Sequence, residues 1–339
     1  MTTYDVTLIA GDGIGPEITE QTVRALEATG LTFNWEHELA GMAAVDQTGT
    51  PLPDTTVDSI RRTRLALKGP LTTPVGTGFR SVNVGLRREF ELFANIRPAK
   101  TLIPGGRYSN VDIVMVRENL EGLYIGAEHF VAIGDDPRAV GESTAIVTRH
   151  GCERIIRYAF EYAIKHGRRK VTIVHKANIL KMVSGLFLEV GKKLAEEYKS
   201  QVESNDMIVD NCAMQLVMRP EQFDVMVTTN MFGDILSDEV SGLVGGLGLA
   251  PGANIGTRAA IFEAVHGSAP DIAGQGIANP AAQMFAAAML LDHIGELDWG
   301  NRLREAVEST IVQDNVRTRD LGGSASTREF GDAVVRRLG

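Results

Sequence analysis

Short apolar runs rich in β-branched residues alternate with segments of helical spacing along most of the chain. The runs predict buried strands at residues 6–10, 111–116, 171–174 and 224–228. Strands that alternate with helices in this way are typical of an α/β protein with a largely parallel sheet.

Helical segments follow several of these strands. A glycine-rich turn at residues 11–15 leads into a helix through Leu26, with Pro16 in its first turn. Further helices are predicted from Cys152, from about Gly233 after a turn at Asn230, and over residues 281–291.

Two passages rich in glycine and proline, residues 103–106 and 242–256, interrupt the alternation. We therefore predict a discontinuous first domain of residues 1–100 plus 250–339, a second domain of residues 101–249, and a cleft between them. Residues 128–149 are punctuated by proline and glycine and predict a protruding hairpin or arm.

The composition is that of a globular protein, with 339 residues, 44 % hydrophobic and 23 % charged. The net charge of −9, with no basic block, argues against a nucleic-acid or membrane-surface protein, so an anionic ligand needs local cations. No segment is expected to span a bilayer. Only two cysteines and a start without signal-peptide features lead us to expect a cytoplasmic protein.

Two aspartates, Asp234 and Asp238, stand four residues apart in a predicted helix, so their carboxylates share one face. Mg²⁺ takes one or two protein carboxylates and completes its shell with water and substrate oxygens. The pair is therefore a candidate metal site; the alternative is a solvated acidic face.

Three arginines are candidates for binding a small polycarboxylate, because guanidinium groups match carboxylates bidentately. They are Arg87, Arg97 and Arg117. Arg88 is adjacent to Arg87 on a probable helix, so we expect only one of the two to face a site. Taken singly, an arginine of this kind is more often a surface cation.

Tyr124 and Lys176 are the candidate proton carriers, because both come just after predicted strands. The carboxyl ends of strands form the ligand crevice in α/β folds, and a lysine near a metal and arginines should have a depressed pKa. The alternative for Tyr124 is an amphipathic residue at the core edge. His175 is interpreted as a structural histidine.

Residues 263–274, continuing to 278–280, predict a compact ligand-contacting loop. Its small residues let backbone amides approach phosphates, and an aspartate can accept a hydrogen bond from a ribose hydroxyl. The earlier run of glycines at 11–15 lacks the G-x-G-x-x-G spacing of a Rossmann fold.

Six motifs in order resemble the β-decarboxylating dehydrogenases, the family of isocitrate, 3-isopropylmalate and homoisocitrate dehydrogenases. They are Gly11-Asp12-Gly13-Ile14-Gly15-Pro16-Glu17, Leu86-Arg87 to Arg97-Pro98, Arg117-Glu118-Asn119, His175-Lys176-Ala177-Asn178, Asn230 to Asp238, and His266 to Asp271. The resemblance covers nearly the whole chain. It implies two α/β/α domains that share a long mixed sheet, a non-Rossmann fold, and a homodimer whose subunits exchange an arm and share the active site.

The resemblance also implies roles for individual residues. Tyr124 and Lys176 are implied as catalytic residues, with Asp234, Asp238 and the neighbouring subunit's Asp210 as ligands of Mg²⁺ or Mn²⁺. The implied substrate-binding residues are Ser81, Asn83, Arg87, Arg97 and Arg117. Those implied for the cofactor are Thr72, Glu263, His266, Gly267, Ser268, Ala269, Asp271, Ile272 and Asn279.

Within the family, Ser81 and Asn83 resemble the isocitrate pattern, because a hydroxyl and an amide can hydrogen-bond a third carboxylate. Asp271 and Ile272 favour NAD, since bacterial NADP-dependent relatives usually carry Lys and Tyr there. The expected reaction is oxidative decarboxylation of isocitrate to 2-oxoglutarate, with Tyr124 protonating the enolate. Leu120 replaces the threonine of many relatives, with little expected consequence. The alternatives are a homoisocitrate or 3-isopropylmalate dehydrogenase and a non-catalytic regulatory subunit.

Overall fold

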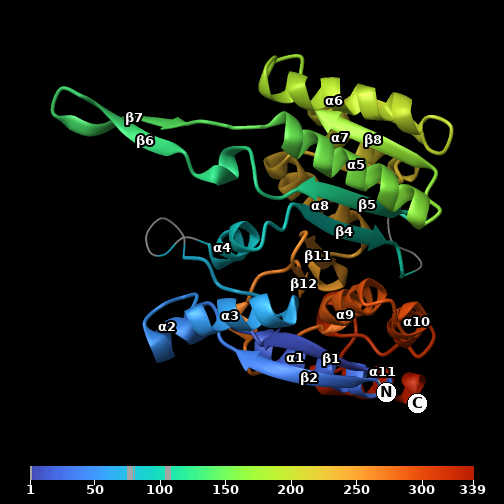
Figure 1. The fold of residues 1–339 in the computed structure, drawn as a ribbon. Helices are drawn as coiled ribbons and strands as arrows, with labels where there is room; N and C mark the ends of the chain where they lie inside the picture. The colour runs from blue at the N-terminus through green and yellow to red at the C-terminus, as the bar shows by residue number, and fades with distance from the viewer. Residues whose placement is uncertain (1, 75–78, 80, 104–107) are drawn as a thin grey trace. The chain divides into compact units, whose positions relative to one another are not determined.

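The computed structural model describes residues 2–74, 79, 81–103 and 108–339 (Figure 1). Ten of the described strands belong to one mixed sheet and two to a separate hairpin, and helices alternate with them. The predicted α/β class with a mixed sheet is therefore confirmed.

The chain divides into two compact units. Unit 1 contains Met1–Leu92, Arg97–Val111 and Ser241–Gly339, and unit 2 contains Phe93–Ile96 and Asp112–Val240. Compared with the domains expected from the sequence, unit 1 also takes residues 101–111 and 241–249, and residues 93–96 belong to unit 2. The strand β4 (Ala94–Lys100) is thus divided between the units.

Unit 1 has five strands of its own in the order β2-β1-β3-β12-β11. They are β1 (Thr3–Ile9), β2 (Thr32–Glu38), β3 (Leu65–Lys68), β11 (Pro251–Ile255) and β12 (Ala260–Ala264). Neighbours pair in parallel except β11 and β12, which are antiparallel. The passage 242–256, expected to connect domains, therefore holds a strand of the sheet. In the other expected connection, residues 104–106 lie outside the described residues.

Seven helices of unit 1 are described: α1 (Gly15–Glu27), α2 (Met42–Thr48), α3 (Asp54–Thr63), α4 (Val82–Glu89), α9 (Ala281–His293), α10 (Leu297–Val312) and α11 (Thr327–Leu338). Helix α9 is buried on almost every side because it packs against β11, β12, α1 and α10. Its run of alanines permits this close packing from all directions. The predicted helices at Pro16 and over residues 281–291 are confirmed.

Unit 2 has four parallel strands in the order β5-β10-β8-β9. They are β5 (Asp112–Glu118), β8 (Lys170–His175), β9 (Glu203–Ile208) and β10 (Val225–Thr228). Helices α5 (Arg149–Lys165), α6 (Val183–Tyr198) and α7 (Val209–Met218) pack on them. Every residue of β10 is buried, which explains why its sequence is a continuous apolar run.

Helix α8 (Asn230–Val244) begins three residues earlier than predicted. The amide of Gly233 donates to the carbonyl of Thr229 at 2.9 Å, so the expected turn at Asn230 is already the first helical turn. Short 3₁₀ turns lie at Leu123–Ile125, Pro220–Gln222, Leu247–Leu249, Pro270–Ile272 and Arg319–Leu321.

A hairpin of β6 (Glu128–Ile133) and β7 (Asp136–Ser143) extends away from helices α5 and α6 of unit 2 (Figure 1). All its strand residues are exposed, including Phe130 and Ile133, at 58 % and 63 %. The predicted hairpin is confirmed, and its role in dimerisation stays a prediction. Among the helices described, none has the length and apolar character required to cross a membrane.

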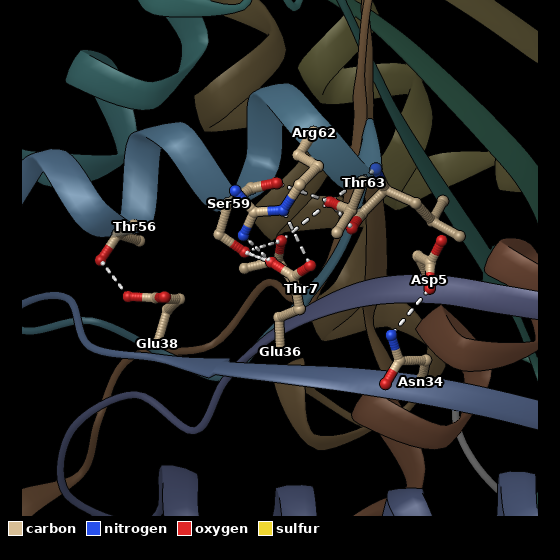
Figure 2. A network of polar contacts seen from close by, with 10 residues as sticks. Asp5, Thr7, Asn34, Glu36, Glu38, Thr56, Ser59, Arg62 and Thr63 are labelled. Atoms are coloured by element: carbon tan, nitrogen blue, oxygen red, sulfur yellow. Dashed lines mark hydrogen bonds and ion pairs between the residues drawn. The ribbon is translucent and has the colours of Figure 1, made fainter.

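Hydroxyl groups connect helix α3 to strands β1 and β2 through a chain of polar contacts (Figure 2). Thr7 of β1 is fully buried, and its hydroxyl lies 2.7 Å from Ser59 Oγ and 2.8 Å from Thr63 Oγ1. Ser59 donates to Glu36 at 2.6 Å, and Arg62 pairs with the same carboxylate. Each buried hydroxyl thus has a partner, which removes the cost of placing it under the helix.

A buried ion pair joins β3 to β12. Lys68 Nζ lies 2.6 Å from the carboxylate of Glu263, with side chains only 2 % and 8 % exposed. Asn254 donates to the same carboxylate at 2.7 Å, and Lys68 also donates to the carbonyl of Gly69 at 3.0 Å. Burial alone would raise the pKa of Glu263, but the charges of Lys68 and Arg87 and these hydrogen bonds lower it to about 2.

Replacing one member of this pair leaves a buried charge unpaired. We expect Glu263→Gln to lower the free energy of unfolding at pH 7 by about 3 kcal/mol, measured by urea titration. The carboxylate's depressed pKa stabilises the folded state above the unfolded pKa, so this contribution disappears as the pH falls from about 5 to about 2. The difference between wild type and variant should shrink over that interval.

The matched control is the double variant Lys68→Met/Glu263→Gln, which removes both charges and should be less destabilised than Glu263→Gln alone. A difference between wild type and Glu263→Gln that is the same at pH 7 and pH 3 would contradict the role of this ion pair.

Candidate functional site

Arg117, at the carboxyl end of β5, organises the first part of the candidate site in unit 2. Its side chain is 1 % exposed, and its Nε and Nη2 donate to Oδ1 of Asn230 at 3.1 and 2.7 Å. Its Nη1 forms an ion pair with Asp234, and Tyr124 donates its phenolic hydrogen to the other oxygen of Asp234 at 2.5 Å. We call Arg117, Tyr124, Asn230 and Asp234 the arginine cluster.

The start of helix α8 must approach Arg117 closely for these contacts to form. A Cβ atom at Gly233 would lie 2.5 Å from Cγ of Arg117, so only glycine fits at this point of the helix. The guanidinium also lies over the ring of Tyr124, 5.2 Å from its centroid. The geometry of the arginine cluster therefore depends on close backbone packing as well as on charge.

Two glutamates hold the segment that carries Tyr124. Glu118 is buried and accepts hydrogen bonds from the amides of Leu120 and Glu121 at 2.9 and 2.8 Å. Burial raises the pKa of Glu118. Glu121 in turn accepts from the amide and hydroxyl of Thr148, whose side chain caps helix α5. Leu120 contributes its backbone amide here, which any residue type can supply.

A second group, the lysine pair, consists of Lys176 after β8 and Asp210 in the first turn of α7. Their side chains form an ion pair and are 26 % and 66 % exposed. The hydrogen bond from Lys176 lowers the pKa of Asp210. His175 is buried: its Nε2 lies 3.2 Å from Asp206, and its Nδ1 accepts the amide of Ala177 at 3.0 Å. These contacts agree with a structural histidine.

The donor set for a divalent cation is divided between these groups. Asp234 and the exposed Asp238 lie one turn apart on α8, and Asp210 belongs to the lysine pair. Carboxylate oxygens fit a hard cation such as Mg²⁺ or Mn²⁺. Within the described part of one chain, no three His, Cys, Asp or Glu side chains are grouped to hold a metal. That Asp210 of the neighbouring subunit completes the site stays a prediction.

In unit 1, the predicted cofactor loop is held against the glycine-rich turn. The hydroxyls of Ser268 and Thr72 lie 2.6 Å apart, and the carbonyl of Ser268 accepts the amide of Ile14 at 2.9 Å. Ala269 adopts a left-handed conformation with φ of 39°, which turns the chain sharply after Ser268. Ile272 packs beside Ile14, while Asp271 is exposed.

Three further predicted cofactor residues have definite partners. Nδ1 of His266 lies 2.9 Å from the carbonyl of the exposed Gly267, and burial lowers the pKa of His266. Asn279 donates to Asp320 at 2.8 Å and accepts the amide of Ala281 at 2.9 Å. The carboxylate of Glu263 is enclosed by its partners in the buried ion pair, so the contacts it shows are structural; its contact with a cofactor stays a prediction.

The predicted substrate residues are distributed over both units. Ser81, Asn83 and Arg87 lie at or in helix α4 and Arg97 in β4, all within unit 1, whereas Arg117 lies in unit 2. Arg87 is buried and Arg88 exposed, as expected for adjacent helical residues of which one turns inward. In the described structure, Oδ1 of Asn83 is buried without a hydrogen-bond partner, which leaves bonding capacity for a ligand.

Sequence reasoning missed several residues that shape these sites. They are Asp12, Lys68, Asn230, Asn254 and Asp320. Two carried a usable signal. Lys68 ends an otherwise apolar strand, where a charge needs a buried partner, and Asp12 stands between glycines that allow close approach. The other three gave no local signal, because their roles depend on the residues that the fold brings beside them.

Comparison with known proteins agrees across the whole chain. Residues 5–334 match the family model described as isocitrate/isopropylmalate dehydrogenase. The chain is 45 % identical to "Isocitrate dehydrogenase [NAD] subunit 2, mitochondrial" of Schizosaccharomyces pombe, over 99 % of this chain and 88 % of that protein. It is 48 % identical to the isocitrate/homoisocitrate dehydrogenase of Thermus thermophilus, over 99 % and 98 % of the two chains.

A solved structure agrees with these matches. The crystal structure of isocitrate dehydrogenase from Methylococcus capsulatus superposes with a TM-score of 0.95 at 56 % identity and covers 99 % of both chains. The chain belongs to the isocitrate/isopropylmalate dehydrogenase family and has the family's fold.

Proposed function

We propose that the protein is an NAD-dependent isocitrate dehydrogenase that converts isocitrate to 2-oxoglutarate and CO₂ with Mg²⁺ or Mn²⁺. The observation that carries the proposal is the arginine cluster, in which Arg117, Tyr124 and Asp234 contact one another directly. It combines a carboxylate-binding cation, a proton donor and a metal-binding carboxylate. These are three of the groups that oxidative decarboxylation of a hydroxy acid requires, beside a base and a hydride acceptor.

A bound divalent cation supplies the positive charge that acidifies the substrate's hydroxyl group and polarises its carbonyl. Asp234 and Asp238 would hold it from this chain. Arg117 binds and orients a substrate carboxylate, because its guanidinium is fixed by Asn230 and Asp234. Tyr124 supplies a proton from its phenolic oxygen to the product carbon.

The lysine pair supports a site shared between two subunits. The resemblance places Asp210 in the neighbouring subunit's site, and Lys176 is in direct contact with Asp210 of its own chain. The two side chains must therefore serve the same site. We propose that each homodimer site combines the arginine cluster of one chain with the lysine pair of the other, so that Lys176 takes the hydroxyl proton of isocitrate bound to its partner.

Apolar side chains exposed on unit 2 support the homodimer. The hairpin exposes Phe130 and Ile133, and the segment after β8 exposes Ile179 and Met182, at 67 % and 83 %. Helix α8 exposes Ile235 at 60 % beside Asp234. Large apolar side chains in such number are unfavourable in water and are typical of a subunit interface.

NAD is favoured over NADP by the loop in unit 1. Asp271 is exposed at the start of a 3₁₀ turn and can accept a hydrogen bond from a ribose hydroxyl, while its charge repels a 2′-phosphate. The neighbouring Ile272 offers only an apolar side chain. Relatives named NAD isocitrate dehydrogenase agree with this assignment.

Homoisocitrate is the alternative substrate that a comparison favours, since the relative from Thermus thermophilus carries both substrates in its name. Ser81 and Asn83, which match the isocitrate pattern, favour isocitrate. The 3-isopropylmalate and regulatory-subunit alternatives stay open to the same assay, and the cytoplasmic location stays a prediction.

The substrate assignment is tested by following NADH formation with isocitrate, homoisocitrate and 3-isopropylmalate, with and without Mg²⁺. We expect kcat/KM for isocitrate to exceed that for 3-isopropylmalate by at least about 100-fold, because an apolar arm leaves the polar groups of Ser81 and Asn83 unpaired. Comparable turnover of 3-isopropylmalate contradicts the substrate assignment. Absence of any turnover identifies a regulatory subunit.

Mixed dimers test the shared site. Tyr124→Phe and Asp210→Asn homodimers should each lose at least about 100-fold in kcat. A Tyr124→Phe:Asp210→Asn heterodimer, isolated with two different tags, should recover about half of wild-type activity, because one of its two sites then contains no replaced residue.

The matched control is the heterodimer of Lys176→Met with Asp210→Asn. Since Lys176 and Asp210 serve the same site, both of its sites are defective and it should stay inactive. Recovery in this control, or no recovery in the first heterodimer, would show that the residues are combined differently.

A further inference from the structure

The glycine-rich turn at residues 11–15 contacts two other loops of unit 1 through its backbone. The amide of Asp12 donates to the carbonyl of Pro70 at 2.7 Å, and the amide of Ile14 donates to the carbonyl of Ser268 at 2.9 Å. These amides are occupied by protein carbonyls, which distinguishes the turn from a phosphate-binding glycine loop. The turn instead joins the segment after β3 to the predicted cofactor loop.

The glycines of the turn are required by close approach. A Cβ at Gly11 would lie 2.4 Å from the carbonyl oxygen of Pro70, and one at Gly13 would lie 1.9 Å from that of Ser268. Both glycines have positive φ, at 83° and 58°. On the third side, a Cβ at Gly41 would lie 2.2 Å from the carboxylate of Asp12. Three segments thus meet at the glycine-rich turn, and the one at Gly41 lies against the carboxylate of Asp12.

The carboxylate of Asp12 is 7 % exposed and accepts three backbone hydrogen bonds. Oδ2 accepts the amides of Thr72 and Met42 at 2.8 and 3.1 Å, and Oδ1 accepts the amide of Ala43 at 3.0 Å. It therefore holds the start of α2 and the segment of Thr72 together. The hydroxyl of Thr72 continues this network to Ser268 at 2.6 Å.

We infer that Asp12 is a positioning residue for cofactor binding: its carboxylate fixes the backbone of Thr72, and through it the Thr72–Ser268 pair. The inference rests on the proposed function, in which that pair contacts NAD. All three partners are backbone N–H donors, so both side-chain oxygens of Asp12 act as acceptors. In Asp12→Asn, the amide NH₂ must face at least one backbone N–H, so one contact becomes donor against donor.

The test combines steady-state kinetics with hydrogen exchange of the Asp12→Asn enzyme. We expect KM for NAD to rise about fivefold to tenfold, with kcat and KM for isocitrate changed less than about twofold, since one charge-assisted hydrogen bond is lost. Peptides covering residues 69–74 and 41–45 should exchange faster than in wild type. Asp12→Glu should not rescue KM, because its longer side chain cannot fit against Gly41.

The matched control is Thr56→Val, which removes a buried hydrogen bond to the carbonyl of Leu39, 2.6 Å long, in the same unit. It should lower the melting temperature without moving KM for NAD. Unchanged exchange over residues 69–74 in Asp12→Asn, or a fall in kcat with unchanged KM, overturns the inference. If the proposed function is wrong, wild type will not reduce NAD. Hydrogen exchange over residues 69–74 then still tests whether Asp12 fixes the backbone of Thr72.

Discussion

The contact of Arg117 with the first turn of helix α8 is the interaction on which the candidate site depends. Arg117 lies next to the last residue of the buried strand β5, and its guanidinium donates to Oδ1 of Asn230 and pairs with Asp234. Glycine at position 233 allows the helix to come close enough. Because Tyr124 also binds Asp234, this carboxylate brings together the residues proposed for substrate recognition, proton donation and metal binding.

Buried charge plays a similar organising part in unit 1. The Lys68–Glu263 pair joins two strands, and Asp12 holds two segments together by accepting three backbone amides. Both groups are buried. Removing any one of their partners would therefore leave a charged or polar group unsatisfied and lower the free energy of unfolding. These buried contacts thus fix the backbone that carries the side chains predicted to contact NAD.

Much of the fold could be predicted from the sequence, because it depends on local pattern. Parallel strands buried on both faces, such as β10, read as continuous apolar runs, and Pro16 marks the start of its helix. Helical periodicity predicted that only one of Arg87 and Arg88 turns inward, and the structure shows that Arg87 is the buried one. Strand β11 was missed because its glycine and proline content resembles a linker, and it becomes a strand through its pairing with neighbours in the sheet such as β12.

The sequence predicted which residues form the candidate site, but not how those residues contact one another. Motif spacing identifies Asp234 and Tyr124, but their hydrogen bond joins positions 110 residues apart. The pairing of Lys176 with Asp210, which decides that they act together, likewise depends on tertiary structure. Asn230 acts through Arg117, and a single-sequence pattern carries no information about such an indirect role. The glycines beside Asp12 indicate close approach, but not which backbone amides its carboxylate accepts.

The central claim is that Asp234 is the carboxylate where substrate and metal meet, and Mn²⁺ binding measures it most directly. With isocitrate present, wild type should bind Mn²⁺ in electron paramagnetic resonance titrations. Asp234→Asn should weaken that binding by at least about 100-fold. The control Asp206→Asn, at an exposed aspartate beside His175, should leave the Mn²⁺ affinity unchanged. Equal Mn²⁺ affinity of wild type and Asp234→Asn in the presence of isocitrate would contradict the account.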